Sequence, residues 1–401
     1  MARPEPAIAG RGGIEVSLKA SLADGLDGVR EYMNFYPYTC SEQMLSRAVA
    51  LNDRAAWDAQ MNRLPAFLDR DGLVRYFATE AIPGEDALTA YVLQLAAETG
   101  WPIPDATRAR MIAGLKGFVD GRIVRRSALP TADLAIRKVA AIDALARHGE
   151  AQAAMLGSLA IEPQLWPTSA VIDWLDLLAR VERVPRAAER SAEAEQVLRT
   201  RLNFQGTVMT FSTERNDGLW WLMISGDVNA NRLLLTVLDR PGWREDVPRL
   251  VRGALSRQQR GRWNTTVANA WGMLAMRRFS AQFEKEPVEG ASRIAYGPTV
   301  RTVDWSTKPV KSEASLPWQE GAGTVTVTQQ GSGKPWLMLR TTAALPIVKA
   351  VSTGYRITRT VVPVEQKTPG RWTRGDVARV RLQIAAQTDM SWVVVDDPVP
   401  G

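Results

Sequence analysis

The sequence predicts a multidomain α+β protein in which a long helical region precedes a β region. At 401 residues the chain exceeds what one hydrophobic core usually organises, so we expect two or three domains. Ala, Leu and Arg with helical spacing dominate before residue 285, whereas Val, Thr, Gly and Pro dominate after it. One strand-like run, Ile14, Val16 and Leu18, stands alone ahead of the helical region.

The helical region reads as a series of about a dozen helices, which we expect to form hairpins packed in a ring or bundle. Apolar residues recur every three or four positions, as on one face of a helix. They are Val171, Trp174, Leu175, Leu178 and Val181 in one segment, and Val267, Trp271 and Leu274 in another. The breaks between helices are Asp71-Gly72, Pro83-Gly84, Asp120-Gly121, His148-Gly149 and Pro241-Gly242.

The β region consists of short alternating runs separated by Pro and Gly, which predicts a sandwich of antiparallel strands. Val380, Leu382 and Ile384 alternate with polar residues, the pattern of a half-buried strand. Further strands are expected at Val325 with Val327, at Leu337 with Leu339, and from Ser391 to Val395. The isolated run at residues 14–18 has no local partner, so we expect it to pair with these late strands across the whole helical insert.

Charge and composition argue against several classes of protein. The net charge of +7 comes from Lys and Arg scattered among 43 acids, and the densest basic run, Arg122 to Arg126, is short. We therefore interpret the excess as a solvated surface and expect no nucleic-acid partner. No apolar stretch approaches the length of a membrane span, and the first residues lack the hydrophobic core of a signal peptide. With one Cys and one His far apart, we expect no metal site and no cofactor.

The single cysteine lies in the run YPYTCSEQMLSR, at residues 36–47. Cys40 precedes the carboxamide of Gln43 by three positions, and on the first turn of a helix such positions share a face. The sulfur can therefore attack the side-chain carbonyl of Gln43 and expel ammonia, which leaves an internal thioester. The helix N-terminus is expected to favour the thiolate.

A thioester survives only while water is excluded, and Tyr36, Tyr38 and Met44 are suited to covering it. The alternative for Cys40 is a buried, inert thiol. The four-residue motif alone does not decide between the two.

The surroundings of the motif resemble the alpha-2-macroglobulin and complement superfamily, specifically its bacterial branch. Cys40, Ser41, Glu42 and Gln43 match the family's thioester motif, although Thr39 stands where the family usually has Gly. The blocks that resemble the bacterial thioester domain are GLDGVREYMNFYPY (25–38), EDALTAYVLQLA (85–96), LWPTSAVIDWL (165–175), GLWWLMISGD (218–227) and GRWNTTVANAWGMLA (261–275). GYRITRTVVPVEQ (354–366) and DMSWVVVDDPVP (389–400) resemble the final macroglobulin-like domain.

The resemblance implies an alpha/alpha toroid thioester domain inserted in a CUB-like β-sandwich. Residues 1–24 and 286–352 would form the CUB-like domain, 25–285 the toroid, and 353–401 the start of a truncated macroglobulin-like domain. It further implies a fragment of a protease-trapping inhibitor, not an enzyme, that links covalently to lysines of a target protease. In the full-length family this takes place in the periplasm, on a lipoprotein, often beside a penicillin-binding protein.

Other residues leave alternative interpretations open. His148 precedes Gly149 and is interpreted as a helix-end residue, while a catalytic role would require it beside Cys40. The loop that carries an acyl-accepting histidine in complement-type relatives corresponds to Val124–Asp133, which has none. Trp220, Trp221, Trp263 and Trp271 are interpreted as core residues, the alternative being a sugar cleft. The competing functions are thus a toroid hydrolase or cysteine-nucleophile enzyme, and a degenerate interaction module with a free thiol.

Overall fold

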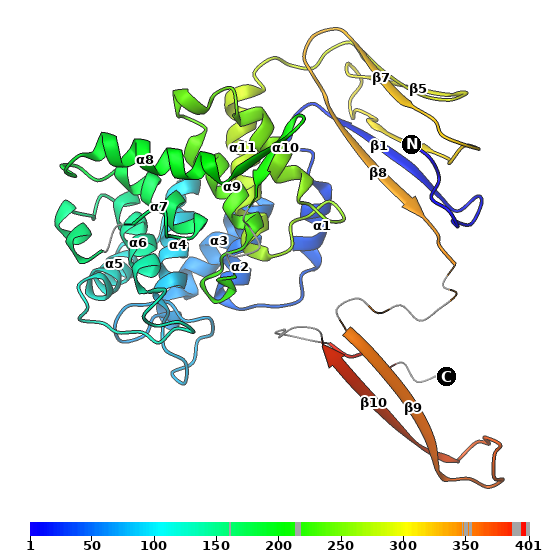
Figure 1. The fold of residues 1–401 in the computed structure, drawn as a ribbon, viewed down its shortest axis with the longest axis horizontal. Helices are drawn as coiled ribbons and strands as arrows, with labels where there is room; N and C mark the ends of the chain where they lie inside the picture. Colours follow the sequence, from blue (N-terminus) through cyan, green and yellow to red (C-terminus); the bar gives the residue numbers. More distant parts are fainter. Residues whose placement is uncertain are drawn as a thin grey trace.

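The computed structural model describes residues 1–159, 162–212, 218–346, 348, 352, 355–386 and 394–397 (Figure 1). The described helical region contains the α-helices α1 (Asp27–Phe35), α2 (Ser41–Leu51), α3 (Arg54–Arg63), α4 (Asp86–Thr99), α5 (Asp105–Val119), α6 (Leu134–Arg147), α7 (Thr168–Leu178), α8 (Ala187–Thr200), α9 (Gly226–Val237), α10 (Val247–Ser256) and α11 (Thr266–Phe283). Short 3-10 helices lie between them: η1 (Leu64–Phe67), η2 (Ala153–Ser158), η4 (Trp220–Leu222) and η5 (Pro241–Trp243). A small hairpin of β2 (Leu202–Gln205) and β3 (Val208–Phe211) is also part of this region.

Side chains and glycines at the helix ends account for where several helices begin and stop. The side chains of Asp53, Ser225 and Thr265 accept backbone N–H groups at the starts of α3, α9 and α11. Gly100 ends α4 with a positive φ, as expected for a residue without a Cβ. The five predicted breaks all lie outside α-helices, so these predictions are confirmed.

The helices pack against their first or second neighbours in sequence, such as α4 against α6 and α9 against α11, and one long-range contact positions the site. α2 packs against α11, the last helix of the region, so the beginning and the end of the helical region are in contact. One apolar core runs through the region and includes fully buried Trp57, Trp174, Trp243 and Trp263. α7 is buried around its whole circumference, so the predicted single apolar face underestimates its burial.

The β region consists of two three-stranded antiparallel sheets. The first has β1 (Gly12–Lys19) between β6 (Glu313–Leu316) and β8 (Trp336–Ala343), and the second has β4 (Ala291–Tyr296) between β5 (Thr299–Asp304) and β7 (Val325–Gln330). Figure 1 shows β1, in blue, beside β8, in orange. Ile14 pairs with Leu316 on one side and Thr341 on the other, so the predicted pairing of the first strand with late strands is confirmed.

The two sheets bury a common core, as the prediction of a sandwich requires. Side chains of β1 and β6 and of β4 and β5 meet in one cluster that contains Ile14, Val16, Leu18, Ile294, Tyr296, Val303 and Leu316. The inward residues of β1 alternate with less buried ones, as expected for a strand with one face in a core.

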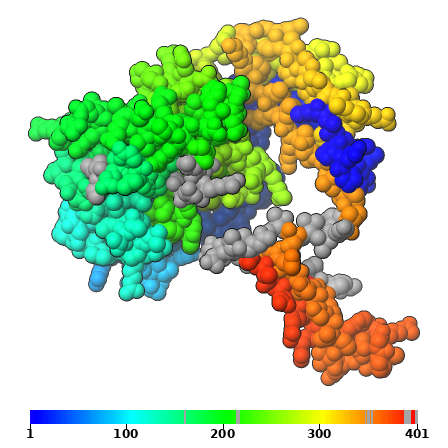
Figure 2. Space-filling view, viewed as in Figure 1, coloured from blue at the N-terminus to red at the C-terminus, as the bar shows by residue number. Residues whose placement is uncertain are grey.

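The last described strands, β9 (Tyr355–Glu365) and β10 (Val377–Ala386), form a two-stranded hairpin (Figure 1). Its atoms are coloured orange to red in the space-filling view (Figure 2). The predicted strand at Val380–Ile384 exists, but the prediction that it is half-buried is wrong. Val380 and Ile384 are both exposed, because no second layer of the described chain covers the hairpin. The strand expected from Ser391 to Val395 lies mostly outside the described residues.

Candidate functional site

The candidate site lies at the first turn of α2. Cys40 is the residue before the helix and has an extended backbone, with φ −67° and ψ 164°. The next residue, Ser41, fixes the start of the helix: its N–H donates to the carbonyl of Tyr76 over 2.9 Å, and its hydroxyl donates to the carbonyl of Arg75 over 2.8 Å. The segment before α4 therefore holds the first turn of α2 in place.

Cys40 and Gln43 contact each other in both directions. The backbone N–H of Cys40 donates to Oε1 of Gln43 over 3.1 Å, and the backbone N–H of Gln43 donates to the sulfur of Cys40. This is a capping box in which a thiol stands in place of the usual hydroxyl. The N–H of Cys40 polarises the carbonyl that its own sulfur would attack, as an oxyanion-hole donor does.

The thiol of Cys40 is protonated at neutral pH, which corrects the expectation of a thiolate. Burial, the largest cause, and the carboxyl of Glu42 raise the pKa of the Cys40 thiol, which comes to about 11. The backbone N–H groups of Gln43 and Glu42 act in the opposite direction, as a helix N-terminus should. Burial outweighs them, because the charged form of a desolvated thiol loses the hydration it would have in water.

A row of three tyrosines lies beside the Gln43 carboxamide. The hydroxyl of Tyr36 accepts a hydrogen bond from Nε2 of Gln43 over 3.4 Å. The Tyr36 ring meets those of Tyr32 and Tyr38 edge to face, at centroid distances of 5.2 and 5.6 Å. The guanidinium of Arg262 lies 3.8 Å above the Tyr32 ring and closes the row from the side of α11.

The predicted covering residues differ in their exposure. Tyr36 and Met44 are partly buried, whereas 53% of the Tyr38 surface is exposed. Tyr76 is not among the predicted covering residues, yet burial raises the pKa of its phenol, with Glu42, Glu85 and Cys40 as further causes. Tyr76 precedes α4 by ten residues in a segment without helical or strand periodicity, so only its packing against α2 identifies it.

Thr39 occupies the position where the resemblance leads one to expect glycine. Its backbone is not among those with a positive φ, so Thr can occupy the turn without the strain that a left-handed conformation would cause. The replacement therefore leaves the entry into α2 intact.

Glu42 points from the same turn toward the interior of the helical region. Its Oε1 accepts hydrogen bonds from the hydroxyls of Ser46, over 2.6 Å, and of Thr266, over 2.8 Å. Thr266 is the first residue of α11, and Ser46 in turn contacts the hydroxyl of Tyr91 in α4 over 2.6 Å. Burial raises the pKa of the Glu42 carboxyl.

His148 lies at the end of α6, as predicted. Its Nε2 lies 2.9 Å from the carbonyl of Leu93, and burial lowers the pKa of its imidazole. Its neighbouring charges are Arg108, Arg147 and Glu150. Within the described chain no hydrogen bond joins His148 to Cys40 or Gln43, so the geometry gives no support to a Cys-His nucleophile pair.

The tryptophans follow the core interpretation only in part. Trp263 and Trp271 are buried, whereas 67% of the Trp220 surface is exposed. The Trp220 ring packs edge to face on that of Trp221. The prediction of a core position is therefore wrong for Trp220, because η4 lies at the surface of the helical region. Trp221 donates from Nε1 to the carboxylate of Asp133 over 2.9 Å.

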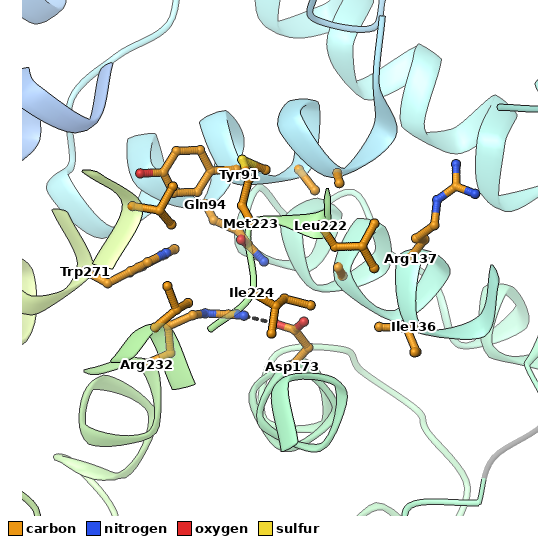
Figure 3. A pocket seen from close by; sticks show the side chains of 15 residues that line it. Tyr91, Gln94, Ile136, Arg137, Asp173, Leu222, Met223, Ile224, Arg232 and Trp271 are labelled. Carbon is orange, nitrogen blue, oxygen red and sulfur yellow. Dashed lines mark hydrogen bonds and ion pairs between the residues drawn. The ribbon is translucent and has the colours of Figure 1, made fainter. Parts of the chain in front are cut away.

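A small cavity of about 50 Å³ lies among α4, α7, α9 and α11 (Figure 3). Its polar wall contains the ion pair of Arg232 and Asp173, and Leu222 at the end of η4 lines it together with Met223 and Ile224. A volume of this size holds roughly three or four waters. This cavity is too small for a sugar.

Two arginines of the basic run at residues 122–126 pair with acidic side chains. In the basic run, Arg122 pairs with Asp120, and Arg125 pairs with Asp69 and Asp71. Among the described residues no cluster of His, Cys, Asp and Glu could hold a metal ion, and no helix is both long and apolar enough to span a membrane.

Comparison with known proteins points to one family. Residues 354–401 match the model of the bacterial alpha-2-macroglobulin MG10 domain. The chain is also similar in fold to the native conformation of Escherichia coli alpha-2-macroglobulin, with a TM-score of 0.60, 18% identity, and coverage of 96% of this chain and 25% of that one. No curated protein sequence matches the chain.

Two further solved structures extend this likeness. A structure of E. coli alpha-2-macroglobulin from domain MG7 to the C-terminus has a TM-score of 0.59 and 17% identity over 96% of this chain and 62% of that one. Salmonella alpha-2-macroglobulin reacted with methylamine has a TM-score of 0.58 and 18% identity, with coverage of 96% and 26%. The chain thus spans between a quarter and two thirds of these structures, and its likeness to them is one of fold. The match to the family model at residues 354–401 agrees with the resemblance inferred from the sequence motifs.

Proposed function

We propose that this chain, a relative of the bacterial alpha-2-macroglobulins, carries an internal thioester between Cys40 and Gln43 and uses it to acylate lysines of an attacking protease. The observation that carries the proposal is the reciprocal contact between the two residues. It places the thiol, the carbonyl that it attacks and a donor for the carbonyl oxygen on a single helical turn.

The bond would form by addition and elimination. The sulfur of Cys40 adds to Cδ of Gln43, the C–N bond of the carboxamide breaks, and the thiol hydrogen leaves with the nitrogen as ammonia. Tyr36 contacts the departing Nε2, so its hydroxyl is placed to hold the leaving group. Because the resting thiol is protonated, its hydrogen must move as the sulfur attacks.

Trapping would reverse the roles of sulfur and nitrogen. The amine of a protease lysine attacks the thioester carbonyl, the C–S bond breaks, and an amide joins Gln43 to the protease while Cys40 regains its thiol. Reaction with methylamine, named for the Salmonella relative, is a reaction of the same class with a small amine. Proteases are therefore the expected partners.

The family relationship also supports the assignment of domains. We assign residues 25–285 to the toroid thioester domain, 1–24 and 286–352 to a CUB-like domain, and 353–401 to a macroglobulin-like domain. The pairing of β1 with β6 and β8, and the contact of α2 with α11, fit this division. A periplasmic location, and a neighbouring penicillin-binding protein for the full-length protein, follow from the same relationship.

Intact mass and thiol titration test the proposal directly. The freshly purified chain should be lighter than its sequence by one ammonia and have no titratable thiol, and methylamine should liberate the thiol and convert Gln43 to its methylamide. Cys40→Ala and Gln43→Ala should each lack the mass deficit. A free thiol without a deficit in the wild-type chain would instead favour an inert cysteine or a cysteine-nucleophile enzyme.

A further inference from the structure

Glu42 is a buried carboxyl group without a cationic partner in the described chain. Only 7% of its surface is exposed, and the influences on its pKa are burial and the hydroxyls of Ser46 and Thr266. A buried carboxylate is normally paired with a positive charge or neutralised by a proton. The environment of Glu42 therefore favours the neutral acid.

The hydrogen-bond pattern agrees with a neutral carboxyl. Both hydroxyls donate to the same oxygen, Oε1, as two donors would to the two lone pairs of a carbonyl oxygen. Among the described residues, both donors to this carboxyl therefore bind one of its two oxygens.

The four residues Tyr91, Ser46, Glu42 and Thr266, the Glu42 chain, connect three helices. Tyr91 belongs to α4, Ser46 and Glu42 to α2, and Thr266 to α11. The Tyr91 ring packs against Trp271 at a centroid distance of 6.0 Å, and both line the small cavity (Figure 3). The Glu42 chain therefore fixes the first turn of α2 to the first turn of α11 from the inside.

Glu42 faces away from the reacting pair, because residues two apart on a helix point in different directions. Cys40 and Gln43 lie toward the tyrosine row, and Glu42 lies toward the helical core. A side chain anchored on the inner face prevents the turn from rotating about the helix axis. That rotation would carry the Gln43 carboxamide away from the sulfur.

We propose that Glu42 is a positioning residue for the Cys40–Gln43 bond, and that it holds the first turn of α2 in its uncharged form. This inference rests on the proposed thioester and names a residue that controls its formation and reactivity. The titratable groups that face Glu42 are themselves neutral at pH 7: Cys40, Tyr32, Tyr36, Tyr76 and Tyr91.

Neutrality matters because the reaction develops negative charge nearby. Attack on the thioester, or on the carboxamide that precedes it, places negative charge on the carbonyl oxygen of Gln43. An ionised Glu42 one residue away would oppose that charge, just as its carboxylate would oppose ionisation of the Cys40 thiol. The uncharged form positions the turn without this repulsion.

The test compares Glu42→Gln, Glu42→Ala and wild type in the full chain. The fraction of chain with the ammonia deficit is measured by intact mass, and the rate of methylamine cleavage is measured from pH 6 to pH 9. Glu42→Gln keeps an acceptor oxygen and carries no charge, so it should form the bond as wild type does. Glu42→Ala removes the anchor and should slow bond formation by about a hundredfold, the effect of a misplacement of about 1 Å.

The pH profile separates the charge of Glu42 from a purely structural role. The fraction of unprotonated methylamine at each pH is the same for both proteins, so it drops out of the ratio of the wild-type to the Glu42→Gln cleavage rate. This ratio should be near one at low pH and fall as Glu42 ionises, whereas a purely structural role would give a flat ratio. Thr266→Val, which removes one donor, should partly reproduce the loss seen in Glu42→Ala.

Three outcomes would overturn the inference. A normal ammonia deficit in Glu42→Ala would show that Glu42 does not position the bond, and would leave the proposed thioester intact. A deficit absent from Glu42→Gln but present in wild type would show that the carboxylate charge is required. Absence of the deficit from wild type would overturn the thioester and, with it, any role of Glu42 in positioning it.

Discussion

The backbone N–H of Cys40 donates to Oε1 of Gln43 over 3.1 Å, so the side chain of the later residue folds back over the earlier one. This contact exists before any covalent bond and uses only the geometry of a helix start. It holds the side-chain carbonyl of Gln43 close to the thiol of Cys40. The predictions below concern how that approach is protected, directed and supported.

Shielding of the thioester should depend on Tyr36 more than on Tyr38. Tyr36→Ala should speed the spontaneous appearance of a free thiol by about tenfold, equivalent to about 1.4 kcal/mol in the barrier, because it admits water to the acyl carbon. Tyr38→Ala should have a smaller effect, since that side chain is already half exposed. Tyr36→Phe is the matched control: in the thioester Nε2 has left, so the hydroxyl is no longer needed. Equal rates for the two alanine variants would contradict this order.

The thioester should prefer amines to hydroxyls. Ester formation at neutral pH needs a nucleophilic catalyst such as imidazole, and the loop at residues 124–133 has none. His148 is held against Leu93 at the end of α6, so His148→Ala should leave the product ratio unchanged. The ratio is measured by mass spectrometry after competition between methylamine and glycerol. Abundant glycerol ester that disappears in His148→Ala would refute the prediction.

Gly272→Ala should destabilise the helical region despite the higher helix propensity of Ala. A Cβ at position 272 would lie 2.2 Å from Cζ3 of Trp263, a fully buried ring whose Nε1 donates to the carbonyl of Ala254. Displacing that ring should cost about 1–3 kcal/mol in the free energy of unfolding. Gly157→Ala, where a Cβ meets nothing within 4 Å, is the control and should change stability by less than about 0.5 kcal/mol. Urea denaturation checks both, and equal stability of the two variants would contradict the packing argument.

Asp143 should make stability fall as pH rises from about 4 to about 7. Burial raises the pKa of its carboxyl to about 7, although Arg147 opposes the shift, while the unfolded value is about 3.9. Between these values the folded chain keeps a proton that the unfolded chain has lost, so raising the pH favours unfolding. Asp143→Asn should remove this part of the pH dependence, measured by urea denaturation at several pH values.

The control for Asp143→Asn is Asp24→Asn at an exposed position, which should leave the pH profile unchanged. Asn keeps an acceptor for the groups that now donate to the carboxylate, Gln94 and Arg147. An unchanged profile in Asp143→Asn would mean that other acids account for the dependence.

The sequence alone was sufficient for features that depend on local spacing. Cys40 and Gln43 are three positions apart, and one helical turn brings such positions together whatever surrounds them. Alternation identified β1, and its lack of a local partner correctly indicated long-range pairing. Glycines and short-range breaks located the ends of helices, because a glycine tolerates a positive φ whatever surrounds it.

Only the tertiary structure decided how the site behaves chemically. The hydroxyl of Thr266 meets Glu42 across 224 residues of sequence, and no periodicity records such a contact. Burial keeps the Cys40 thiol protonated, although a helix N-terminus favours the thiolate. Tyr76 is buried and the pKa of its phenol is raised, whereas Tyr38, which the sequence suggested as a cover, is exposed. Desolvation depends on every element packed around a group, whereas spacing depends only on the helix that carries it.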